Sequence, residues 1–298
     1  MYTLLQKTQN KILKQIHTIP FVRDKAEMAY QIAVEKHILS LPVLSTTDID
    51  LVEQIKQEGV VITSLENLGI PSTPQLLQAA KNLIPKISQN IYIQENEYVI
   101  HASSQQMIEY PDIFLWGLEQ RLLNIVENYL GLPAAYHGAY FRRDLANKVE
   151  KGSRLWHIDK EARKLLKIIV YLNDISEDKG PFQYIPQSLT SKIANYLKYT
   201  SGYITNEAMQ KLTSPANYKS CTGSAGTVIF AGTGDIFHRG KIPIAADRFA
   251  IFFDYSPRVK NQSFYGASSL PHNELLSLTK NLSEQQKQYI FWQKNSWV

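Results

Sequence analysis

Two side chains able to bind one metal ion lie close together in the segment Leu155-Trp-His-Ile-Asp159. His157 and Asp159 stand two positions apart, and an extended strand directs residues at that spacing to the same face. A third candidate, His238, lies far downstream in the segment Gly-Asp-Ile-Phe-His-Arg-Gly. Two imidazoles and one carboxylate that leave coordination positions open are the ligand set of non-haem Fe(II) oxygenases. These residue types predict an oxidative metal centre, provided that the fold brings them together.

A fourth residue, Arg248, opens an apolar strand ten positions after His238. A guanidinium group holds a carboxylate through two parallel N–H bonds, which gives direction as well as strength. Arg248 could therefore hold the remote carboxylate of a keto-acid cosubstrate. A His-x-Asp pair alone is weak evidence, whereas the four residues in this order form a moderately specific pattern.

The composition is that of an ordinary folded protein: 298 residues, 44% apolar and 20% charged. The net charge of +5 suits small anions and nucleic acid equally well. Cys221 is the only cysteine, so no internal disulfide can form and a reducing compartment is expected. Lysines interrupt the N-terminal segment, and no apolar run approaches the ~20 residues of a membrane span. We expect a cytoplasmic protein that does not bind membranes.

The first third of the chain has mainly helical periodicity. Apolar spacing predicts helices over 2–17, 23–39, 47–58, 74–89 and 112–130. Thr47 or Asp48 could cap the third helix, and Gly131 is expected to end the last. A short buried strand is predicted over 59–63, which we expect to join a sheet formed much later in the chain, and 92–101 alternates like a strand.

From Ala134 onward the pattern changes to short strands separated by turns. Strands are predicted over 136–142, 155–159, 166–172, 182–185, 227–230 and 248–255, and helices over 187–197, 205–213 and 283–294. Helices followed by many strands indicate an antiparallel double-sheet jelly roll with flanking helices. We expect one domain over 1–298, with a helix-rich part at about 1–130, a jelly-roll core at about 134–256 and a C-terminal tail at 257–298.

The core resembles the phytanoyl-CoA dioxygenase-like branch of the Fe(II)/2-oxoglutarate oxygenases. The resemblance covers roughly residues 134–256 and rests on Leu155–Asp159, Ile168–Asp174, Lys179–Ser188, Thr227–Phe230, Asp235–Gly240 and Arg248. One departure is that Gln187 and Leu189 stand where the family has glycine and histidine after Ile-Pro. Those positions shape a loop and do not bind iron, so the departure leaves the chemistry unaffected.

The resemblance implies a cupin-like double-stranded β-helix in which His157, Asp159 and His238 bind Fe(II) and Arg248 binds the 5-carboxylate of 2-oxoglutarate. The cosubstrate would chelate the metal and leave one position for O2. Its oxidative decarboxylation to succinate and carbon dioxide would accompany hydroxylation of an unactivated C–H bond. Related halogenases carry glycine or alanine at the position of Asp159, so the carboxylate favours hydroxylation over halogenation.

Three further residues are candidates for contact with the cosubstrate. Arg143 lies at the end of the strand before the His-x-Asp motif, where relatives place a polar residue against the 1-carboxylate. Lys167 and Tyr171 lie on the following strand and share a face, because they are separated by an even number of positions. The alternative is a solvated lysine and a tyrosine that only lines the wall.

Basic residues outnumber acidic ones between Arg142 and Lys167, which predicts an electropositive rim for a small anionic or carrier-linked substrate. Arg154 and Arg163 are the residues on which this hypothesis depends. The alternative is a charged loop that only stays in water. Two other functions stay open: an oxygenase acting on nucleic acid or protein, and a non-catalytic cupin-like binding module. The first lacks a basic tail, and the second has no need of open metal positions.

Overall fold

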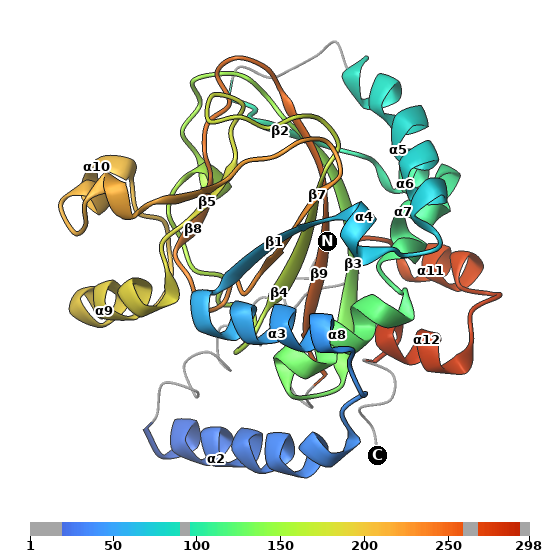
Figure 1. Cartoon of the computed structure of the whole chain (residues 1–298), viewed down its shortest axis with the longest axis horizontal. Helices are drawn as coiled ribbons and strands as arrows, with labels where there is room; N and C mark the ends of the chain where they lie inside the picture. Colours follow the sequence, from blue (N-terminus) through green and yellow to red (C-terminus); the bar gives the residue numbers. More distant parts are fainter. Residues whose placement is uncertain (1–19, 90–95, 259–267, 293–298) are drawn as a thin grey trace.

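The computed structural model describes residues 20–89, 96–258 and 268–292. Its centre is a six-stranded antiparallel sheet in the order β1-β7-β4-β9-β3-β2 (Figure 1). The strands of this large sheet are β1 (Val60–Ser64), β2 (Val99–His101), β3 (Ala134–Asp144), β4 (Leu166–Tyr171), β7 (Thr227–Ala231) and β9 (Arg248–Pro257). A small antiparallel sheet has the order β6-β5-β8 and consists of β5 (Phe182–Tyr184), β6 (Lys219–Cys221) and β8 (His238–Gly240).

The two sheets share one apolar interior. Ile169, Ile229 and Ala250 of the large sheet pack in the same buried cluster as Phe182 and Cys221 of the small one. The chain passes from one sheet to the other several times between β4 and β9, as in a double-stranded β-helix. This arrangement confirms the predicted mainly-β jelly roll with flanking helices. Burial also raises the pKa of the Cys221 thiol, so this side chain is a poor nucleophile.

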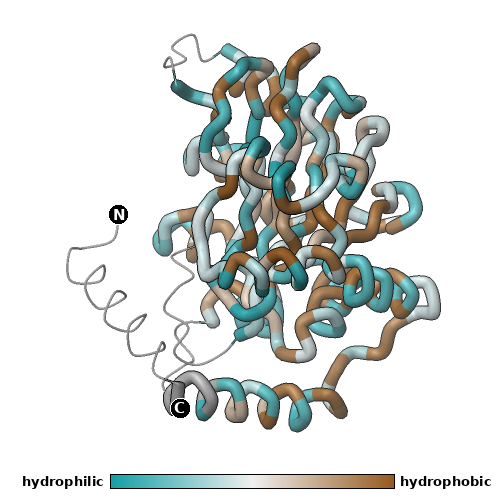
Figure 2. The backbone as a smooth tube through the Cα atoms, turned by 90° about the vertical axis from the view of Figure 1, so that its left-hand side faces the viewer, coloured by the Kyte–Doolittle hydropathy of each residue, from teal (hydrophilic) through white to brown (hydrophobic). Residues whose placement is uncertain are grey.

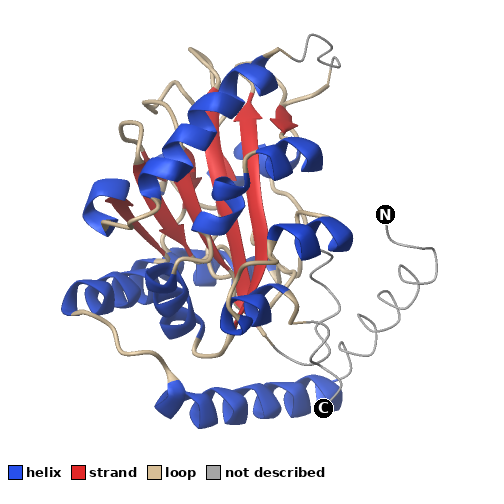
Figure 3. Ribbon diagram, turned by 90° about the vertical axis from the view of Figure 1, so that its right-hand side faces the viewer, coloured by secondary structure: helices blue, strands red, loops and turns tan. Residues whose placement is uncertain are grey.

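Helices cover the opposite face of the large sheet (Figure 3). The helices in the described parts of the chain are α2 (Pro20–His37), α3 (Thr46–Glu58), α4 (Leu65–Leu68), α5 (Thr73–Ser88), α6 (Ser104–Glu109), α7 (Pro111–Trp116), α8 (Gln120–Leu130), α9 (Gln187–Leu197), α10 (Asn206–Gln210), α11 (His272–Leu278) and α12 (Glu284–Ile290). Leu83 of α5, Leu123 of α8 and Ile290 of α12 pack with Ile168 and Phe253 of the sheet in the main core. α9 and α10 instead lie beside the small sheet, and α2 lies at one end of the molecule (Figures 1 and 2).

The predicted 59–63 strand forms as β1 and pairs with β7, which ties the N-terminal part to the core. Its neighbour α3 is capped differently from the prediction, because the Ser45 side chain accepts a hydrogen bond from the Asp48 backbone. The Asp48 side chain instead forms an ion pair with Arg121, whose Nη2 atom lies 2.8 Å from Oδ1. The predicted 2–17 helix lies outside the described residues. Within the described parts of the chain, no helix combines the length and apolar character needed to cross a membrane.

The predicted 112–130 helix is interrupted between α7 and α8. A side chain at Gly117 would collide with the Tyr136 hydroxyl at 2.5 Å, so the backbone here lies directly against the sheet. Apolar periodicity continues through this break, which explains why the pattern suggested one helix. Gly131 ends α8 in the left-handed conformation with φ of 73°, as the sequence predicted. The strands β6 and β8 and the helix α6 were not predicted, since segments of three to six residues carry little periodicity.

Candidate metal centre

The two candidate histidines meet through a backbone bridge between distant segments. The 155–159 segment does not form a full strand; it makes isolated antiparallel bridges from Trp156 to Ile204 and from His157 to His238. His157 and His238 exchange two backbone hydrogen bonds of 3.1 and 2.9 Å. Directly paired residues in an antiparallel bridge project to the same side, so the two imidazole rings lie with their centroids 4.3 Å apart.

Asp159 completes the group. The candidate ligand atoms of His157, Asp159 and His238 all lie within 4.8 Å of one another. The Nε2 atoms of His157 and His238 are 3.5 and 3.7 Å from the two Asp159 carboxylate oxygens. Metal–ligand bonds to nitrogen and oxygen are roughly 2 Å long, so three ligand atoms at these separations can surround one ion.

Backbone carbonyl groups orient both imidazoles. His157 Nδ1 lies 2.9 Å from the carbonyl oxygen of Leu155, and His238 Nδ1 lies 3.2 Å from that of Ile236. These contacts place the proton on Nδ1 and leave the Nε2 lone pair for a metal. Burial lowers the pKa of His238 to about 3 and also lowers that of His157. Both rings are therefore neutral near pH 7, which is the form that binds metals.

The Asp159 carboxylate is buried beside Lys167, whose Nζ lies 2.8 Å from Oδ2. Burial by itself raises the pKa of Asp159, but the Lys167 ammonium and the two imidazoles outweigh it and hold the pKa below its usual range. The Lys167 ammonium is thus a close cationic partner of Oδ2. A buried carboxylate with an imidazole Nε2 lone pair near each of its oxygens is a donor set that fits a divalent cation.

Arg248 lies in the same interior, and its side chain is only 2% exposed. Its Nε and Nη2 atoms contact Asp144 Oδ2 at 3.2 and 2.9 Å, and Nη1 donates to the carbonyl of Gly180. The Tyr171 hydroxyl is fixed nearby between the backbone groups of Phe182 and Cys221. A side chain at position 240 would begin 3.0 Å from Arg248 Nη2, so a glycine there makes room for the guanidinium.

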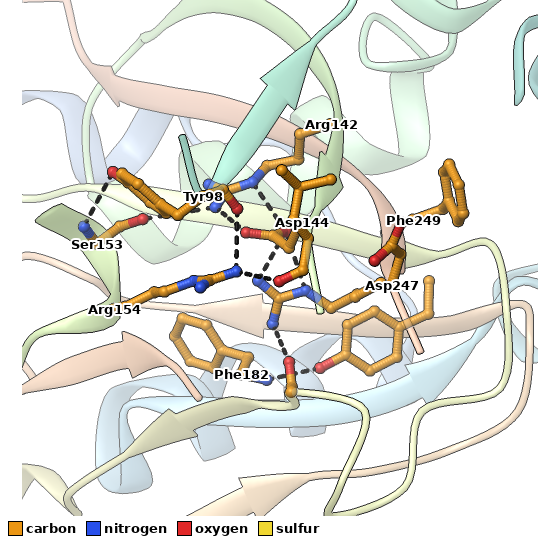
Figure 4. A network of polar contacts seen from close by, with 12 residues as sticks. Tyr98, Arg142, Asp144, Ser153, Arg154, Phe182, Asp247 and Phe249 are labelled. Carbon is orange, nitrogen blue, oxygen red and sulfur yellow. Dashed lines mark hydrogen bonds and ion pairs between the residues drawn. The ribbon is translucent and has the colours of Figure 1, made fainter. Parts of the chain in front are cut away.

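Asp144 is the centre of a buried charge network (Figure 4). Arg142 and Arg248 both pair with its carboxylate, and Arg154 lies close enough to interact with it electrostatically. Burial by itself raises the pKa of Asp144, but Arg142 and Arg248 hold it below its usual range. Two guanidinium groups thus share one carboxylate with a third close by, and this excess of positive charge is suited to a further anion.

The structure does not bring Arg143 to this site. Its Nε atom pairs with Asp247 at 2.6 Å and its Nη1 donates to the carbonyl of Ser88, on the helix-covered face of the large sheet. Adjacent strand residues point to opposite faces, so Arg142 is the arginine that faces the interior. The doublet Arg142-Arg143 carried no signal in sequence to decide which of the two points inward.

The side chains of the predicted electropositive rim are mostly engaged elsewhere. Arg154 is 1% exposed and donates to backbone carbonyls of Tyr98, Leu145 and Val149, so it cannot line a rim. Arg163 pairs with Glu27 and lies over the ring of Tyr30 on α2. The pocket that opens at the candidate ligands has a volume of about 220 Å³. It is lined by His157, Ile158, Asp159, Lys160, Glu161, Ser201, Gly202 and Tyr203, and so carries charges of both signs.

Arg154→Met is expected to lower the free energy of unfolding by about 3 kcal/mol or more, because it leaves several buried carbonyl oxygens without a donor. Urea unfolding of the purified variant measures this change. Arg163→Met provides the control: its ion pair with Glu27 lies at the surface, so the expected loss is under about 1 kcal/mol. Equal stability of Arg154→Met and the wild type would contradict the structural role assigned to Arg154.

Two interior residues, Asp144 and Asp254, were missed in the sequence, and Arg143 was chosen over its neighbour Arg142. Each lies on β3 or β9 and faces the space between the sheets. Asp254 is 8% exposed, and burial raises its pKa to about 6. For the two aspartates, the available signal was an acidic residue within a predicted or adjoining strand, since buried charges persist only with a partner or a role.

A scan against protein-family models finds no match, and a search of curated proteins finds no relative. Similar solved structures include HygX from Streptomyces hygroscopicus with nickel and 2-oxoglutarate bound, at 15% identity and a TM-score of 0.49, over 78% of this chain and 97% of that chain. EctD from S. alaskensis with bound Fe is 17% identical with a TM-score of 0.49, over 76% and 80% of the two chains. The non-heme alpha ketoglutarate dependent epimerase SnoN is 14% identical with a TM-score of 0.47, over 71% and 83%. At these identities and TM-scores, the chemistry of the site rests on its own geometry.

Proposed function

We propose that this chain is a non-haem Fe(II)- and 2-oxoglutarate-dependent dioxygenase that hydroxylates an unactivated C–H bond of a small molecule. The observation that carries the proposal is the convergence of His157, Asp159 and His238 at one point, with their ligand atoms within 4.8 Å. Two imidazoles and a carboxylate occupy three positions of an octahedral ion and leave three for other ligands. A purely structural metal site would close its coordination sphere with protein groups.

The positive network around Asp144 supports a dicarboxylate cosubstrate. Arg248 and Arg142 would hold the remote carboxylate of 2-oxoglutarate, because both guanidinium groups face the interior and share a single counter-charge. At an effective dielectric of about 20, such a contact between opposite charges is worth about 4 kcal/mol at about 4 Å. When bound, iron and 2-oxoglutarate would together supply the oxidising power for a reaction with O2.

The residues of the chain hold, orient and shield the reactants. Asp159 fills the position that a halide would need, which supports hydroxylation as the reaction. Phe182 packs its ring 5.4 Å from that of His238 and closes the interior side of the centre. Tyr203, 58% exposed with its ring 5.1 Å from that of His157, lies at the mouth of the pocket, where a substrate would approach. The 220 Å³ volume of this pocket supports a small molecule as substrate.

Succinate release from 2-oxoglutarate tests the proposal without knowledge of the substrate. The purified chain with Fe(II), O2 and 2-oxoglutarate is expected to form succinate slowly, whereas omission of iron or addition of a chelator abolishes it. His238→Ala is the matched control, because it removes one ligand from the same pocket. Binding of neither Fe(II) nor 2-oxoglutarate by the wild-type chain would overturn the proposal.

A further inference from the structure

One cation lies between two buried carboxylates in the interior of the barrel. Lys167 Nζ is 2.8 Å from Asp159 Oδ2, and Lys167 is the direct cross-strand partner of Asp254 on β9. Paired residues in an antiparallel ladder point to the same face with Cβ atoms roughly 5 Å apart. The ammonium group therefore has two carboxylates within reach of its flexible four-carbon stem.

Asp254 is the carboxylate that lacks a close partner. Its Oδ1 atom is buried and makes no hydrogen bond within the described parts of the chain. On its other side, Asp254 pairs with Gly138 of β3, which has no side chain to donate a bond. Lys167 and, more weakly, Arg142 interact with Asp254 electrostatically. A buried carboxylate oxygen left in this way costs about 1–3 kcal/mol, which indicates a role in another arrangement of the site.

A divalent ion at Asp159 changes the balance of charge around Lys167. The metal would take the carboxylate that now attracts the ammonium, and the two cations would repel each other across a few ångströms. Asp254 then becomes the more favourable partner, and it lies across a single strand pairing. The Lys167 side chain can thus pair with one buried carboxylate when the metal is absent and with the other when the metal is bound.

We propose that Lys167 is a movable counter-ion of the metal centre, which pairs with Asp159 when the metal is absent and with Asp254 when the metal is bound. Asp254 is accordingly a positioning residue that draws Lys167 away from the metal. This inference rests on the proposed metal centre. It also explains why Asp254 has an unpartnered oxygen while Lys167 contacts Asp159.

Substitutions of Lys167 and Asp254 are expected to change metal affinity in opposite directions. Lys167→Met removes a competitor for Asp159, so Mn(II) should bind at least about tenfold more tightly. Asp254→Asn removes the alternative partner and leaves Lys167 on Asp159, so Mn(II) should bind about tenfold more weakly. When Asp254→Asn is added to Lys167→Met, Mn(II) affinity should differ from that of Lys167→Met alone by less than about threefold, because no lysine remains to be drawn away.

Isothermal titration of the full chain with Mn(II) measures these constants without reference to turnover. Lys164→Met is the matched control: its ammonium donates to the Tyr129 carbonyl at 3.0 Å and should leave Mn(II) affinity unchanged. Thermal unfolding checks that each variant folds, and Asp254→Ser replaces Asp254→Asn should the latter not fold.

Weaker Mn(II) binding by Lys167→Met would overturn the proposal, since the lysine would then support the metal. An equal effect of Asp254→Asn in the wild-type and Lys167→Met backgrounds would also overturn it, because Asp254 would act on the metal charge directly. Both results would leave the dioxygenase proposal intact. Absence of Mn(II) and Fe(II) binding by the wild-type chain would instead remove the metal centre itself.

Discussion

Asp159→Gly is expected to bind Fe(II) at least about 100-fold more weakly and to release no succinate above background. The carboxylate supplies the only negative charge among the three candidate ligands, and both of its oxygens face an imidazole nitrogen at 3.5–3.7 Å. Substitution of groups that merely support a ligand costs roughly 10–100-fold in metal affinity, so loss of the ligand itself should exceed that range.

Metal content after dialysis and titration with Fe(II) under anaerobic conditions measure this loss. Asp50→Ala is a suitable control, because Asp50 is exposed on α3 and far from the site in the chain. The control should keep the wild-type metal content and succinate release. Unchanged iron affinity in Asp159→Gly would exclude Asp159 as a ligand.

Arg248→Met is expected to weaken 2-oxoglutarate binding by about 100-fold or more. Truncation of one partner of a buried, hydrogen-bonded charge pair costs roughly 2–5 kcal/mol, and Arg248 is 2% exposed against Asp144. Arg248→Lys keeps the charge but loses the two-pronged geometry, so it should bind 2-oxoglutarate with intermediate affinity. Titration of the Mn(II)-loaded variants with 2-oxoglutarate gives these constants.

Arg143→Met is the matched control for Arg248→Met, because Arg143 also lies on the large sheet in an ion pair but on the opposite face. Its 2-oxoglutarate affinity should equal that of the wild type. Loss of affinity in Arg143→Met with retention in Arg248→Met would reverse the assignment of the two arginines. A urea unfolding curve for each variant separates loss of binding from loss of the fold.

Large elements with regular periodicity were predictable because their signal is local. The helices α3, α5 and α9 and the strands β4, β7 and β9 form within a few residues of the predicted ranges. Among the shorter elements, β1 and β5 were predicted but β6, β8 and α6 were not. The helices α7 and α8 are separate because Gly117 meets the Tyr136 side chain of a distant strand. Such a break depends on packing between segments, which no single window of sequence contains.

Residue types and spacing by themselves determined the candidate ligands, since His157 and Asp159 are two positions apart and a strand-like backbone places such residues on one face. They also determined the jelly-roll class, through the change from helical to strand periodicity near residue 134. The tertiary structure alone decided which charges face the interior: Arg142 does and Arg143 does not, and Asp144 and Asp254 join Arg248 and Lys167 there. The physical reason is that a one-residue shift in strand register moves every side chain of the strand to the opposite face of the sheet. Pairing between strands far apart in sequence fixes that register.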